Sequence, residues 1–124
     1  MHQPIYEELK RVAATRKTTT YGAIAPLAEL DMSNPADRNR IAEILGEISS
    51  HEHETGRPLL SAVVVLQETN MPGKGFFTLA RELDLLKPGE EELTFFCREV
   101  TKVHETWDIP SELNLREQHN RRRR

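Results

Sequence analysis

The chain has 124 residues, of which 37% are hydrophobic and 30% charged, a composition typical of one folded domain rather than of a disordered chain. Seventeen basic residues against 20 acidic ones give a net charge of −3, so tight binding of nucleic acid through bulk charge is not expected. The single cysteine, Cys97, excludes an internal disulfide, and with no signal-peptide or membrane-spanning pattern the sequence predicts a cytoplasmic protein.

The first predicted element is an amphipathic helix over residues 4–16. Ile5, Leu9 and Val12 recur at helical spacing, so they form one apolar face. Threonines at positions 18–20 interrupt it, because β-branched hydroxyl residues are poor in helix interiors and good at helix starts. A short helix over residues 21–30 is therefore predicted to follow, with Thr20 as its N-cap.

A polar turn at residues 31–35 leads into a longer helix, predicted over residues 35–52. Ser33 or Asn34 caps this helix and Pro35 occupies its first turn. Its apolar side chains share one face and are Ile41, Ile44, Leu45 and Ile48. Two helices joined by a short polar turn predict a helix-turn-helix.

The second half of the chain begins with the β-branched run 59–66, which predicts a strand. Residues 67–75 carry proline and glycine and predict a turn or a hairpin, which is compatible with a wing, followed by a helix over 76–86. A final amphipathic helix is predicted over residues 90–107, with these side chains inward: Leu93, Phe96, Cys97, Val100, Val103 and Trp107. Phe95 is then expected on the opposite face, where it marks a surface for a partner.

Together these elements predict an α+β fold, a small winged helix-turn-helix-like domain over residues 1–107 with additional N- and C-terminal helices. Residues 108–124 lack a core pattern and predict a flexible basic tail that ends in Arg121–Arg124. Without these four arginines, residues 1–120 hold 13 basic and 20 acidic residues. Residues 1–60 hold 7 and 9, and residues 61–120 hold 6 and 11, so the acidity is concentrated away from the helix-turn-helix.

Four segments follow one another in the order seen in a known protein family: TTYGAIAPLA, NPADRNRIAEIL, RPLLSAVVV and PGKGFF. Between residues 18 and 86 the chain resembles the DNA-binding domain of the alkylguanine-DNA alkyltransferases and their non-catalytic relatives, the alkyltransferase-like proteins. The resemblance implies that Tyr21 disturbs the phosphate beside a target nucleotide. The helix-borne arginine that replaces the flipped base in that family aligns with Asn39, which Arg38 and Arg40 flank.

The reactive strand departs from the family. Its cysteine, histidine and arginine align with Ser61, Ala62 and Val63. Alkyl acceptance needs a thiolate activated by a nearby base, and this trio offers neither. Ser61 is therefore a degenerate alkyl-acceptor position, and the chain departs even from ordinary alkyltransferase-like proteins, which keep the histidine and arginine.

The sequence thus favours a non-enzymatic DNA-binding or DNA-sensing module, with enzyme status left open because a distant constellation of residues is invisible in one sequence. No cofactor is indicated, and no metal site, since His51 and His53 point apart on a helix. The alternative is a protein–protein interaction module, possibly homodimeric, that uses the C-terminal helix. The predicted DNA-contacting residues are Tyr21, Arg38, Asn39, Arg40, Arg57 and Lys74.

Overall fold

The computed structural model describes residues 1–108, and the predicted tail from residue 109 onward lies outside the described residues. The α-helices in this part are α1 (Gln3–Ala14), α2 (Tyr21–Ile24), α3 (Pro35–Glu54), α4 (Lys74–Glu82) and α5 (Glu92–Trp107). Two 3₁₀ helices and two short strands complete it: η1 (Ala25–Ala28), η2 (Leu60–Val63), β1 (Thr19–Thr20) and β2 (Val64–Val65). Over residues 1–108 the helices lack the length and apolarity that crossing a bilayer requires.

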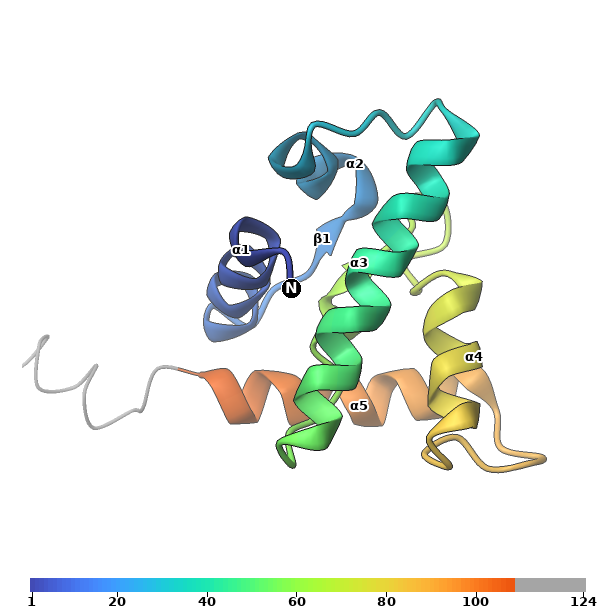
Figure 1. The fold of residues 1–124 in the computed structure, drawn as a ribbon. Helices are drawn as coiled ribbons and strands as arrows, with labels where there is room; N and C mark the ends of the chain where they lie inside the picture. Colours follow the sequence, from blue (N-terminus) through green and yellow to red (C-terminus); the bar gives the residue numbers. More distant parts are fainter. Residues whose placement is uncertain (109–124) are drawn as a thin grey trace, which may run out of the picture.

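The long helix α3 crosses α5, with α1 on one side of the crossing and α4 on the other (Figure 1). The segment through η2 and β2 runs inside this arrangement, because η2 contacts α1, α3 and α5. The predicted apolar face of the first helix is confirmed, since Ile5, Leu9 and Val12 are buried against the same core. The coarse prediction of a small α+β domain is likewise confirmed, with helices dominating and a sheet of only two strands.

Local capping chemistry sets the helix starts that the sequence predicted. The Thr20 hydroxyl accepts a hydrogen bond from the Ala23 backbone N–H at 3.2 Å, as expected of an N-cap. The Asn34 side chain accepts from the N–H groups of Ala36 and Asp37 at 2.8 and 3.3 Å, so α3 begins at Pro35. Each cap satisfies donors that the helix itself leaves free.

The predicted strand over residues 59–66 is mostly wrong. Residues 60–63 form a 3₁₀ helix, and only Val64 and Val65 pair, in parallel with Thr19 and Thr20. All residues from Leu59 to Val65 are nevertheless buried, at 5% exposure or less. A continuous apolar run indicates a segment that is buried on every side. A short helix in the centre of the fold fits this pattern as well as a strand does.

Of the two alternatives predicted for residues 67–75, the turn is confirmed and the hairpin is wrong, because this segment contains no strand. It forms a tight turn instead, in which the Leu66 N–H donates to the Met71 carbonyl and the Asn70 N–H donates to the Leu66 carbonyl, both at 2.8 Å. The turn leads directly into α4. Lys74 is therefore the first residue of a helix and not the tip of a wing.

The face assigned to the last helix is partly wrong. Leu93 is 51% exposed and Cys97 is exposed, whereas Phe95 is only 1% exposed and packs near Phe76. The cause is Glu99, whose buried carboxylate accepts a hydrogen bond from the Leu59 N–H at 2.8 Å. Turning this carboxylate inward brings Phe95 inward as well, since residues four apart share a helix face.

A buried polar network joins α1 to α3. The Glu52 side chain is fully buried and accepts from the Tyr6 hydroxyl at 2.8 Å. Arg57 donates to the same carboxylate through Nε at 2.7 Å and through Nη2 at 3.0 Å. Its guanidinium also lies 5.4 Å from the centre of the Trp107 ring, so the network extends to α5.

This network predicts a loss of stability in acid. Burial raises the pKa of Glu52, but hydrogen bonds from Arg57 and Tyr6 lower it more, so the pKa lies below its ordinary 4.5. The stabilisation is complete above the unfolded-state pKa and is lost as pH falls through the folded-state value. Urea unfolding from about pH 6 down to about pH 3 should show the decline. An Arg57→Met variant should show a smaller decline, because Glu8, Asp31 and Glu90 also have lowered pKa values, and an unchanged decline there would contradict this assignment.

Candidate ligand pocket beside Tyr21

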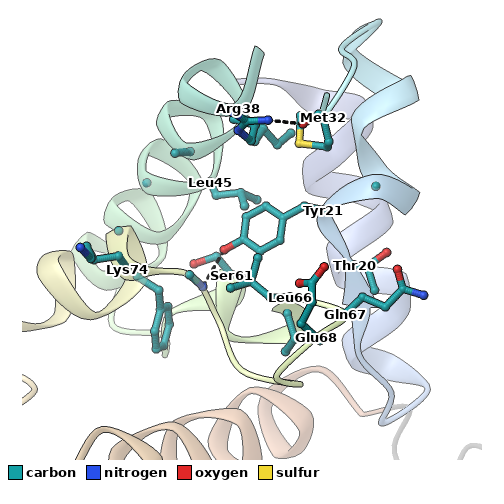
Figure 2. Close-up of a pocket in the computed structure, with 18 of the residues that line it drawn as sticks. Thr20, Tyr21, Met32, Arg38, Leu45, Ser61, Leu66, Gln67, Glu68 and Lys74 are labelled. Carbon is teal, nitrogen blue, oxygen red and sulfur yellow. Dashed lines mark hydrogen bonds between the residues drawn. The ribbon is translucent and has the colours of Figure 1, made fainter. Parts of the chain in front are cut away.

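A pocket of about 570 Å³ lies between the start of α2, the N-terminal half of α3 and the segment from β2 to α4 (Figure 2). Its surface is mainly apolar, and the side chains that make it so include Met32, Ile41, Leu45, Val65, Phe76 and Leu79. Polar side chains stand among them from three separate parts of the chain. This volume lies within the range of sites that bind small organic groups.

Tyr21 projects into this pocket from the first turn of α2 (Figure 2). Its hydroxyl accepts a hydrogen bond from the Gly73 backbone N–H at 2.9 Å. Burial raises the pKa of Tyr21 and the bond from Gly73 lowers it by less, so the phenol stays neutral at physiological pH. A Cβ atom on Gly73 would lie 2.8 Å from the Tyr21 oxygen, so a side chain here would displace the Tyr21 hydroxyl.

Arg38 is the predicted recognition-helix residue that reaches the pocket. Its Nη1 donates to the Met32 carbonyl at 2.8 Å, which holds the guanidinium at the edge of the pocket (Figure 2). Asn39 is exposed on α3 and does not line the pocket. Arg40 is also exposed and pairs with Glu43 at 3.3 Å. The structure therefore brings Arg38, and not its two neighbours, to the pocket that Tyr21 also lines.

Ser61 lines the pocket from η2, although it is only 5% exposed. Its hydroxyl shares a 2.7 Å hydrogen bond with the Ser49 hydroxyl, which also accepts from the Ser61 N–H at 3.0 Å. The residues that line the pocket include no histidine and no cysteine. Cys97, the one cysteine of the sequence, lies exposed on α5. The pocket thus offers neither the cysteine thiol nor the histidine base that align with the family's alkyl-acceptor site.

The remaining predicted site residues lie in different places. Lys74 is exposed and lines the pocket from the start of α4. Arg57 instead belongs to the Glu52 network and does not line the pocket, so the structure gives it a role in the fold. His51 and His53 lie near the end of α3, and residues 1–108 contain no group of three potential metal ligands.

Sequence reasoning missed several residues of the pocket. Gln67 and Glu68 line it from the turn after β2, and Gly46 lines it from the middle of α3. A polar pair directly after a buried apolar run was the available signal for Gln67 and Glu68. Gly46 gave a signal too, because glycine is unfavourable inside a helix unless its lack of a side chain serves a purpose.

Comparison with known proteins adds no assignment to this geometry. Neither a protein-family model, nor a curated protein sequence, nor a solved structure matches the chain.

Proposed function

We propose that the chain is a non-enzymatic DNA-binding module that resembles a degenerate alkyltransferase-like protein, and that its pocket receives a nucleobase turned out of a duplex. The observation that carries the proposal is the convergence of Tyr21, Arg38 and Ser61 on one pocket. They come from three elements up to 40 positions apart in the sequence. The resemblance aligns Tyr21 and Ser61 with residues of the family that act on DNA. It aligns Asn39, the neighbour of Arg38, with the arginine that replaces the flipped base.

The chemistry of the pocket supports a planar aromatic guest. A nucleobase leaving the stack needs apolar and aromatic surface to replace its neighbours, and Tyr21, Met32 and Phe76 supply such surface. The proposed helix-turn-helix consists of α2 with η1, the turn at residues 29–34, and α3. In this arrangement the N-terminal end of α3 faces the duplex, where the Arg38 side chain of its first turns contacts phosphate.

The charges near the pocket support weak binding through phosphate contacts. Arg38 and Lys74 are the basic residues that line it, and Glu68 is the one acidic residue that does. Two phosphate contacts give a shallow salt dependence, with a slope of about −2 in a plot of log K against log salt.

The rival function, a protein-interaction module that uses the C-terminal helix, loses its predicted anchor because Phe95 is buried.

Fluorescence anisotropy with labelled duplexes tests the proposal. We expect a duplex with one unpaired, bulged nucleotide to bind more tightly than a fully paired duplex at about 50 mM salt, where phosphate contacts are strong. Arg38→Ala should weaken binding of the bulged duplex about tenfold, since it removes one charge-assisted hydrogen bond at the pocket.

The matched control is Arg81→Ala, which removes the same charge from an exposed residue that does not line the pocket. It should change the affinity by less than about twofold, because an exposed, screened charge contributes little. Equal losses of affinity in the two variants would show that the duplex binds through the overall charge of the protein and not through the pocket. No binding of either duplex at low salt would refute the proposed function.

A further inference from the structure

Resting on the proposed function, we infer that Glu68 selects the guest of the pocket, which admits a nucleotide whose base carries an exocyclic amino group. The segment that brings Glu68 to the pocket is the turn between β2 and α4. This turn is held by the bonds between Leu66, Asn70 and Met71. Glu68 is therefore presented by a defined loop and not by a free end.

Several polar side chains of the pocket are already engaged within the protein. The Tyr21 hydroxyl is bonded to Gly73, the Ser61 hydroxyl to Ser49, and Arg38 to the Met32 carbonyl. Within residues 1–108, the side chains of Gln67, Glu68 and Lys74 line the pocket without a hydrogen bond or ion pair to another residue. These three groups are fully available to a polar guest, and Arg38 keeps the guanidinium N–H groups that its bond to Met32 does not use.

The basic and acidic side chains of the pocket lie on opposite sides of it. Lys74 and Arg38 lie on the side formed by α4 and α3, and Gln67 and Glu68 lie on the side of the turn after β2 (Figure 2). The Glu68 carboxylate is directed toward the Tyr21 side of the pocket. A nucleotide has the matching polarity, because its phosphate is anionic and the amino group of its base donates hydrogen bonds.

The carboxylate discriminates between bases because it only accepts hydrogen bonds. Cytosine, adenine and guanine each carry an amino group that donates to it, and pairing of an acidic side chain with the cytosine amino group is a known mode of base reading. Uracil and thymine carry a carbonyl oxygen at the corresponding position. Two acceptors facing each other repel and leave a desolvated carboxylate unpaired, so these bases are disfavoured.

The sharpest test compares two duplexes that differ only in the bulged nucleotide, deoxycytidine or deoxyuridine. The two bases share size and shape and differ at the amino or carbonyl group and the adjacent ring nitrogen. We expect the full chain to bind the cytosine bulge about 5- to 20-fold more tightly, the lower part of the range that one good base-edge contact gives. Glu68→Ala should reduce this ratio below about twofold, and Glu68→Gln, whose amide also donates to a carbonyl, should reduce or reverse it.

Glu68 is exposed, so these variants leave the core intact. The matched control is Glu82→Ala on α4, which removes one exposed negative charge outside the pocket. It should raise both affinities together and keep their ratio. Binding of both duplexes with equal affinity, or a cytosine preference that survives Glu68→Ala, would overturn the inference and leave the proposed function standing. Failure to bind either bulge would remove the proposed function, and the inference with it.

Discussion

Replacing Arg57 with methionine is expected to lower the free energy of unfolding by about 3 kcal/mol, because it leaves a buried carboxylate without its charged partner. The Glu52 side chain is fully buried, and Arg57 supplies two of its hydrogen bonds, at 2.7 and 3.0 Å. Methionine keeps an apolar stem over Trp107, so the change isolates the charge. Urea denaturation followed by circular dichroism measures the effect. The slope of the unfolding free energy against urea concentration should stay unchanged.

The control for this prediction is Arg11→Met, which removes a salt bridge to Glu8 on the surface of α1. Arg11 is 65% exposed, and exposed ion pairs contribute at most about 1 kcal/mol, so a small change is expected. A loss below about 1 kcal/mol for Arg57→Met would contradict a structural role for the Glu52 network and return Arg57 to the predicted DNA-contacting set.

Replacing Gly46 with leucine is expected to close the pocket while keeping the protein at least as stable as the parent chain. Gly46 lies inside α3 and lines the pocket, and a Cβ atom built on it has no neighbour within 4 Å. Leucine favours helix over glycine by roughly 0.8 kcal/mol, so thermal stability should rise or stay constant. Its side chain occupies the space proposed for the base. Binding of the bulged duplex should therefore fall at least about tenfold, which corresponds to the loss of one base-edge contact or more.

Gly46→Ala provides the matched control, since it gains the same helix propensity with a single methyl group. It should be about 1 kcal/mol more stable than the parent chain and bind the bulged duplex within about threefold of it. Opposite movements of stability and binding in Gly46→Leu separate a filled pocket from a damaged fold. Undiminished preference for the bulged duplex in Gly46→Leu would show that the base is received elsewhere.

The helices were predictable because their signals are local. Thr20 and Asn34 cap helices through bonds that span two or three residues, and the apolar face of α1 follows from spacing alone. The phase of α5 was not predictable, because Glu99 is buried by a bond to Leu59, 40 residues earlier. Periodicity assigns a carboxylate to the surface, and only its distant donor makes burial favourable.

Two candidate site residues illustrate the same difference. Arg38 and Arg57 are both arginines near the ends of α3, and the sequence predicted DNA contact for each. The structure brings Arg38 to the pocket through the Met32 carbonyl and binds Arg57 to Glu52. Their separate roles depend on partners that composition and spacing do not identify.

The sequence by itself determined that helices begin at Tyr21 and Pro35, that residues 59–66 form a continuous apolar run, and that an alkyl-acceptor thiol is missing at Ser61. Each of these depends on residue type or on contacts within one turn. Only the tertiary structure decided that the buried run is a 3₁₀ helix, that no hairpin follows it, and that Glu68 shares a pocket with Tyr21 and Arg38. The physical reason is that a pocket is the space left between packed elements, so its lining depends on how distant segments pack together.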